Sequence, residues 1–132
     1  MAPFFLELVD VLSIHRDQLE RYGGTPGIRD AGLLEAAVEQ ARAGFGGEYL
    51  HRDLLEMAAA YLYHLVRNHS FVDGNKRTGA VAALVFLDLN GVLVDMDEDE
   101  LAELVEGVAA GRLGKEEIVA AFRRSGAPPG GP

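Results

Sequence analysis

The sequence contains no cysteine. The chain can therefore form neither a disulfide framework nor a metal site built from thiolates. It also lacks any uncharged apolar run of about 18 residues, which is the length that a membrane-spanning helix requires. No basic flank followed by a long apolar stretch stands at the amino terminus, so a secretory signal is not expected. These absences predict a cytoplasmic protein that does not enter the membrane.

Basic residues are also few, because 12 Lys and Arg stand against 21 Asp and Glu and the net charge is -9. Such an acidic chain repels the phosphates of nucleic acid, so direct nucleic-acid binding is not expected. With 132 residues, of which 48% are apolar, the chain suits one globular domain with a hydrophobic core. We expect this domain to cover residues 1–125, followed by a disordered tail over 126–132.

Apolar residues recur at helical spacing along most of the chain. The pattern predicts helices over about residues 7–22, 30–43, 52–68, 75–89, 97–110 and 115–124. Gly44, Gly46 and Gly47 indicate a loop between the second and the third helix. From Ala80 to Leu89 the fourth helix is apolar on nearly all sides, which favours burial at the centre of a bundle. The predicted fold class is all-α, a compact bundle of about six helices around a buried central helix.

Residues 69–77 read His-Ser-Phe-Val-Asp-Gly-Asn-Lys-Arg. If the fourth helix begins near Asn75, Lys76 and Arg77 lie in its first turn. The helix dipole disfavours cations there by ~0.3–1 kcal/mol per charge. A placement that breaks a local rule without an evident structural gain is expected at functional sites. We therefore expect an anion at this helix start, and a phosphate fits best.

The remaining residues of the motif suit the same chemistry. Gly74 can adopt backbone angles that curl the loop around a ligand, and Asn75 can donate from its side chain. Asp73 is the nearest carboxylate and a natural Mg²⁺ ligand beside substrate phosphates. His69 can take a proton from an incoming hydroxyl, whereas Phe71 is expected to point into the core. The stretch thus combines an anion cradle, a metal ligand and a general base.

The segment His-x-Phe-x-Asp-Gly-Asn-Lys-Arg-Thr resembles the signature of Doc (death-on-curing) toxins, the compact branch of the Fic superfamily. Most Fic proteins carry glycine where Lys76 stands and arginine where Ala80 stands, and both departures are typical of Doc-like members. The resemblance extends over roughly residues 5–95. Within this range, and outside the motif, the matching segments are residues 14–15, 23–24, 27–30, 33–35, 63–65 and 83–91.

The resemblance implies a Fic/Doc-type domain and the toxin of a toxin–antitoxin system. Such a toxin transfers the γ-phosphate of ATP to a hydroxyl of a translation factor, elongation factor Tu by resemblance, and so arrests translation. A Phd-like or other small antitoxin blocks the site. By the same resemblance, His69 is the catalytic base and Asp73 the Mg²⁺ ligand. Gly74, Asn75, Lys76 and Arg77 form the turn that binds the phosphates.

Two other functions stay open. Fic enzymes usually transfer AMP, although Lys76 would crowd the place where such an enzyme seats the α- and β-phosphates. A non-catalytic module that sequesters a partner is the second alternative. A plain capping loop, with Asp73 as the cap, would explain neither the first-turn cations nor His69 and Phe71 together.

Other segments carry weaker signals. The segment from Gly23 to Asp30 is either a simple turn or, as in Fic proteins, a flap that holds the target by backbone pairing. We expect His15 and His64 to form hydrogen bonds within the bundle rather than to bind metal. Residues 95–106 form a solvated acidic helix face or, less simply, a docking surface for a basic antitoxin segment.

Overall fold

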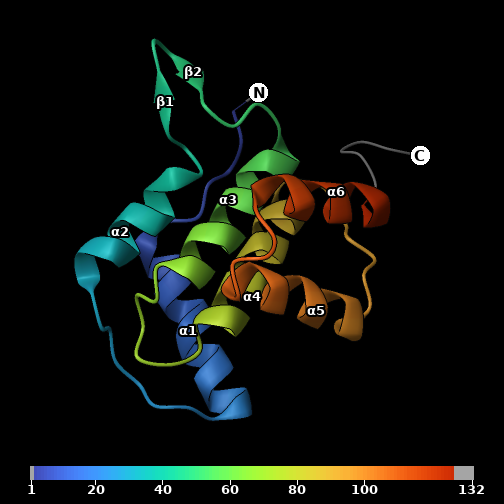
Figure 1. Cartoon of the computed structure of the whole chain (residues 1–132). Helices are drawn as coiled ribbons and strands as arrows, with labels where there is room; N and C mark the ends of the chain where they lie inside the picture. The colour runs from blue at the N-terminus through green and yellow to red at the C-terminus, as the bar shows by residue number, and fades with distance from the viewer. Residues whose placement is uncertain (1, 127–132) are drawn as a thin grey trace.

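The computed structural model describes residues 2–126. It contains six helices and one two-stranded hairpin, as Figure 1 shows. The helices are α1 (Leu8–Tyr22), α2 (Ala31–Gln40), α3 (Leu54–Arg67), α4 (Asn75–Leu89), α5 (Glu98–Ala109) and α6 (Lys115–Ser125). The hairpin joins β1 (Gly44–Phe45) to β2 (Glu48–Tyr49). The predicted all-α class and the number of helices are confirmed.

Aspartates cap three of these helices. Asp30, Asp53 and Asp97 each accept a hydrogen bond from the backbone N–H three residues later, at 3.0, 2.8 and 2.7 Å. α4 begins differently, because its cap is Gly74 in the left-handed conformation (φ 81°) with no side-chain cap. The first turn of α4 therefore keeps its N–H groups available to other acceptors.

The central helix is α3 rather than α4, which the sequence favoured for this position. α3 packs against α2, α4, α5 and α6. Its buried residues include the run from Ala58 to Ala60, whose small side chains let neighbouring helices approach from several sides. α4 lies along α3 but leaves Val85 39% and Leu89 52% exposed. Both helices are apolar, and α3 is central because it is the one that packs against four other helices.

The predicted loop around residues 44–47 is instead the turn of the hairpin. Gly44 pairs with Tyr49, and Phe45 pairs with Glu48. Gly46 and Gly47 have φ values of 63° and 84°, and positive φ at both central residues is what a type I′ hairpin turn requires. The hairpin projects from one end of the bundle in Figure 1.

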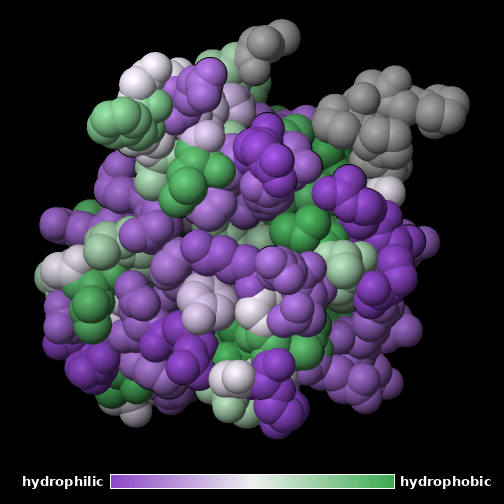
Figure 2. Space-filling view, turned by 45° about the horizontal axis from the view of Figure 1, so that its top comes forward, coloured by the Kyte–Doolittle hydropathy of each residue, from purple (hydrophilic) through white to green (hydrophobic). Residues whose placement is uncertain are grey.

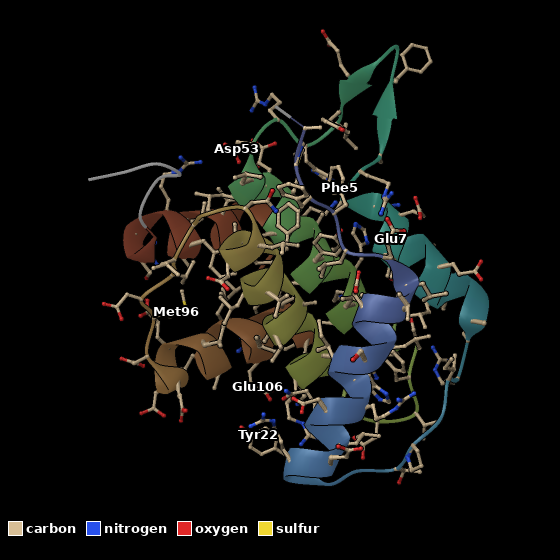
Figure 3. All side chains as sticks on the ribbon, turned by 180° about the vertical axis from the view of Figure 1, so that it is seen from behind. Phe5, Glu7, Tyr22, Asp53, Met96 and Glu106 are labelled. Carbon is tan, nitrogen blue, oxygen red and sulfur yellow. The ribbon has the colours of Figure 1, made fainter. Side chains whose placement is uncertain are left out.

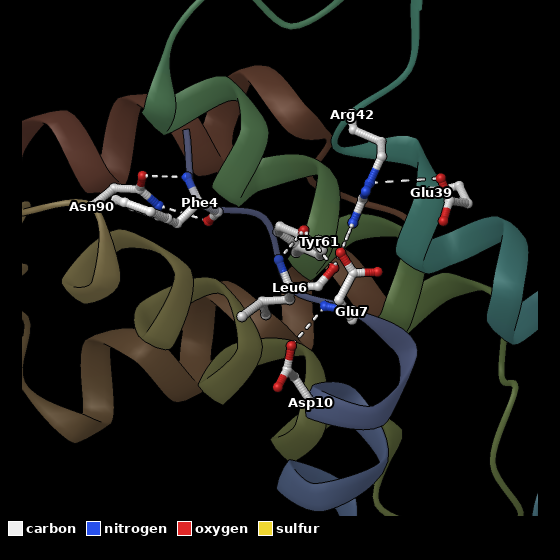
Figure 4. Close-up of polar contacts among 8 residues, drawn as sticks. All are labelled: Phe4, Leu6, Glu7, Asp10, Glu39, Arg42, Tyr61 and Asn90. Atoms are coloured by element: carbon white, nitrogen blue, oxygen red, sulfur yellow. Dashed lines mark hydrogen bonds and ion pairs between the residues drawn. The ribbon is translucent and has the colours of Figure 1, made fainter. Parts of the chain in front are cut away.

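The amino-terminal segment is tied to the central helices, as Figure 4 shows. The side chain of Asn90 accepts from the backbone N–H of Phe4 at 2.8 Å and donates to its carbonyl at 3.0 Å. The hydroxyl of Tyr61 accepts from the backbone N–H of Leu6 at 2.9 Å. Burial raises the pKa of Tyr61 to about 12, so the hydroxyl keeps its proton. Polar contacts thus attach the chain start to α3 and to the end of α4.

The surface is mixed. Figure 2 shows hydrophobic patches separated by hydrophilic residues on the face that it presents. No helix among residues 2–126 is long and apolar enough to cross a membrane. Gly126 pairs with Val94, so the ordered domain extends to the first residue of the predicted tail. The rest of that tail, residues 127–132, lies outside the described residues.

Acid should destabilise the fold through His64. Its Nε2 is buried and has no hydrogen-bond partner among the described residues. Burial, aided by the charges of Lys115 and His51, lowers the pKa of His64 from 6.5 to about 4. As the pH falls, His64 therefore binds a proton in the unfolded chain at a higher pH than it does in the folded chain. The free energy of unfolding should fall as the pH decreases through this interval, by at most about 3 kcal/mol.

Urea unfolding at several pH values across this interval measures the effect. The variant His64→Met has an apolar side chain of similar size that cannot be protonated. It should therefore lose less stability than the wild type between pH 6.5 and about pH 4. An identical pH dependence in both proteins would assign the acid sensitivity to other groups.

Candidate active site

The motif loop, residues 68–74, follows the end of α3 that points away from the hairpin (Figure 1). Phe71 is buried, as predicted, and its ring stacks on the ring of His15 with centroids 3.7 Å apart. The Nε2 atom of His15 lies 2.8 Å from the carbonyl oxygen of Asp73. A carbonyl can only accept, so Nε2 carries the hydrogen. α1 therefore holds the loop through His15. The predicted hydrogen bond of His15 within the bundle is confirmed.

Asn75 closes the loop on itself. Its side-chain oxygen accepts from the backbone N–H of Phe71 at 3.0 Å, and its side-chain nitrogen donates to the carbonyl of Phe71 at 2.9 Å. One of the two N–H donors of this amide is thus used within the loop, and donation from the other to a ligand stays a prediction. The backbone N–H groups of Asn75, Lys76 and Arg77 have no acceptor among the described residues. These backbone groups and the left-handed Gly74 form the candidate anion cradle.

Asp73 presents an exposed carboxylate at the edge of this cradle. Its Oδ2 accepts from the backbone N–H of Thr25 at 3.1 Å, and its Oδ1 accepts from that of Gly74 at 2.9 Å. These two bonds, together with the charges of Arg77 and His15, lower the pKa of Asp73 below its ordinary value. The carboxylate is ionised and oriented, and each oxygen keeps a lone pair for another ligand.

Arg77 is held by the residues that follow α1. Its Nη2 donates to the carbonyl of Gly23 at 2.9 Å, and its guanidinium lies 5.5 Å from the centre of the Tyr22 ring. Gly24 passes so close that a Cβ there would lie 3.0 Å from Oδ2 of Asp73 and 2.7 Å from Leu19. Only glycine fits this approach, since its φ is also 132°. The backbone after α1 thus forms one wall of the site.

Lys76 points to the other side, where its Nζ lies 2.7 Å from Oε1 of Glu106. Figure 3 shows Glu106 and Tyr22 at the same end of the molecule. Glu106 lies near the carboxyl end of α5, where the dipole disfavours an acid, just as it disfavours Lys76 at the start of α4. The two misplaced charges compensate each other. The cation at the start of α4 is therefore explained in part by a carboxylate of the same chain.

His69 is exposed beside the cradle, and its backbone is unusual. Its φ is 50°, and it is the one residue other than glycine with a positive φ between residues 2 and 126. The neighbouring backbone is paired with the segment before α2. The N–H of Val72 donates to Gly27 at 3.0 Å, and Ile28 bridges Phe71. The segment from Gly23 to Asp30 is therefore more than a turn, because it pairs with the motif itself.

Comparison of the sequence with known proteins identifies the family of this chain. The model of the Fic/DOC family matches residues 5–87. The chain belongs to the Fic/DOC family. It is 39% identical over 115 residues to "Protein kinase doc" of Escherichia phage P1, which covers 87% of this chain and 90% of the relative. It is 46% identical over 90 residues to "Toxin Doc" of Mycolicibacterium smegmatis, which covers 67% of this chain and 69% of the relative. The predicted resemblance is confirmed.

In this Fic/DOC protein the site extends beyond the motif that sequence reasoning identified. Thr25, Arg77 and Asp73 meet through the backbone after α1, and Glu106 reaches the site from α5. From the sequence, Glu106 was predicted to belong to a solvated acidic helix face. One available signal was that an acid near the end of a helix is as unfavourable as a cation near its start. Thr25 carried no such signal, since only its backbone takes part.

Proposed function

We propose that this chain is a Doc-type protein kinase and the toxin of a toxin–antitoxin pair. It would transfer the γ-phosphate of ATP to a Ser or Thr hydroxyl of a translation factor, by resemblance elongation factor Tu, and so arrest translation. One observation carries the proposal. The unpaired N–H groups at the start of α4 lie beside two cations, an ionised carboxylate and an exposed histidine. The printed names of the two relatives support the same reading.

We propose the following roles, which the geometry and the family resemblance support. The N–H groups of the first turn of α4 bind phosphate oxygens, and the guanidinium of Arg77 can take two of them at once. Lys76 adds a compact charge that leaves Glu106 for the phosphate. His69 takes the proton of the target hydroxyl while its oxygen bonds to the γ-phosphorus. The bond from the γ-phosphorus to the bridging oxygen breaks, and ADP leaves with the electron pair.

Asp73 fits the magnesium ion that such a reaction requires. Its carboxylate is exposed and ionised, and backbone donors hold both of its oxygens in place. Mg²⁺ binds through one or two carboxylates plus substrate phosphates and water, so a single protein ligand is sufficient. Bound there, the ion would neutralise charge on the phosphates during transfer.

AMP transfer remains the competing reaction, and Lys76 is the residue that favours phosphate transfer. The wider Fic pattern has glycine at this position. By the family resemblance, a lysine in place of this glycine would crowd the place where a Fic enzyme seats the α- and β-phosphates, although here its ammonium is paired with Glu106. The reversed nucleotide, with its γ-phosphate at the cradle, avoids this crowding.

Labelled nucleotide separates the two reactions. The protein is incubated with Mg²⁺, purified elongation factor Tu, and ATP labelled on either the γ- or the α-phosphate. Label from the γ-position alone, with a gain of one phosphate in the intact mass of the target, is the expected result. Label from the α-position with a gain of AMP would overturn the kinase proposal. No modification of any translation factor would contradict both enzymatic functions.

A cognate antitoxin is part of the proposal, a Phd-like or another small protein. Expression of the chain alone should stop growth, and co-expression with its antitoxin should restore it. Under the non-catalytic alternative, the variant His69→Ala would stop growth as well as the wild type does.

A further inference from the structure

The backbone of His69 requires a device that holds it. A left-handed conformation brings the Cβ of a non-glycine residue close to the carbonyl oxygen, so it persists only where the surrounding structure enforces it. In the described part of the chain, this conformation occurs in one residue with a Cβ, and that residue is the proposed catalytic base.

Arg29 supplies that device. Its Nε donates to the carbonyl of His69 at 2.6 Å, and its Nη2 donates to the carbonyl of Asn68 at 3.1 Å. These two carbonyls belong to the peptide planes on either side of the Cα of His69. Because each plane is rigid, fixing both of them fixes the φ and ψ of His69. The planar fork of arginine can hold two carbonyls in one geometry, whereas the single ammonium of lysine cannot.

The position of Arg29 is itself well determined. Its backbone N–H donates to the carbonyl of Ser70 at 2.7 Å, and the next N–H, of Asp30, donates to the same oxygen at 3.0 Å. Asp30 then caps α2. The side chain of Arg29 extends to the end of α3. Asn68 is the C-cap residue there, and the helix dipole favours a cation at this end. Arg29 therefore joins the start of α2, the end of α3 and the motif loop.

We propose that Arg29 is a positioning residue for His69, which holds the two peptide planes around it and so sets the place from which the imidazole meets the target hydroxyl. The inference rests on the proposed role of His69 as the base. The Arg29 side chain donates to backbone carbonyls of Asn68 and His69, and it forms no hydrogen bond with residues 74–77 of the cradle. Its loss should therefore reduce the rate of transfer and leave nucleotide binding unchanged.

The test compares Arg29→Lys with a matched control, Arg67→Lys. Arg67 also donates to two carbonyls at a helix end, those of Val108 and Ala109, the last two residues of α5, at 3.4 and 3.1 Å. Arg29→Lys should lower kcat by about tenfold to a hundredfold, since small misplacements of a reacting group have effects of that size. Its KM for ATP should match that of the wild type. Arg67→Lys should keep both constants while losing a comparable end-of-helix contact.

A structural measurement keeps the two proposals separate. Backbone chemical shifts of His69, or crystal structures of both variants, report whether this residue leaves the left-handed region in Arg29→Lys alone. Equal kcat values in the two lysine variants would overturn the inference. A raised KM for the protein target at unchanged kcat would also overturn it, because Arg29 would then be a docking residue. If the wild type transfers nothing but His69 moves only in Arg29→Lys, the positioning contact is supported and the proposed function is overturned.

Discussion

Replacement of His69 by alanine is expected to reduce phosphate transfer by about 10²–10⁴-fold, the usual contribution of a positioned general base. His69 is exposed, so the substitution should leave the fold intact. Asp73→Asn should cause a comparable loss by weakening the proposed magnesium site, and it should raise the Mg²⁺ concentration that gives the half-maximal rate. Label transfer from γ-labelled ATP measures both effects.

A second substitution at the same position separates chemistry from strain. His69→Gly should be as inactive as His69→Ala but more stable, by up to about 1 kcal/mol, because glycine adopts the observed φ of 50° without the Cβ conflict. Urea unfolding of the two variants gives this difference. A His69→Ala variant that still modifies the target at the wild-type rate would remove His69 from the mechanism, whatever its stability.

Gly79→Ala should destabilise the protein by about 1–3 kcal/mol, although alanine is the better helix former by about 1 kcal/mol. Gly79 is buried where α4 crosses α3. A Cβ there would lie 2.8 Å from a methyl group of Val66 and 3.2 Å from the backbone carbonyl of Leu62. Neither neighbour can yield easily, since Val66 is fully buried and the carbonyl belongs to the central helix. Gly79→Val should destabilise the protein further, because its side chain is larger.

Gly32 offers the matched control. It is also helical, but it is exposed, and a Cβ there would meet only a side-chain oxygen of Asp30 at 3.5 Å. Gly32→Ala should therefore stabilise the protein, by up to about 1 kcal/mol. Thermal or urea unfolding of both variants measures the contrast. A stabilising Gly79→Ala would show that the two helices can separate without cost, contrary to the close approach observed.

Much of the fold could be predicted because its causes are local. Apolar spacing and capping aspartates such as Asp30 and Asp97 place the helices within a few residues of their observed bounds. The start of α4 near Asn75 was predicted correctly from the apolar run between Ala80 and Leu89, which is also a local signal. The hairpin and the central place of α3 were not predicted. Both depend on how already formed elements meet, which a short window of sequence does not contain.

The candidate site divides in the same way. The sequence alone determined the motif, because His69, Asp73 and the phosphate turn lie within nine consecutive residues and their chemistry can be read together. The residues that hold and complete this motif were found only in the folded molecule. Arg29 lies 40 residues from His69, Glu106 lies 30 from Lys76, and Thr25 lies 48 from Asp73. Their roles exist only once α1, α2 and α5 pack around α3 and α4. That packing is the sum of many small contacts, so no single spacing in the chain reveals it.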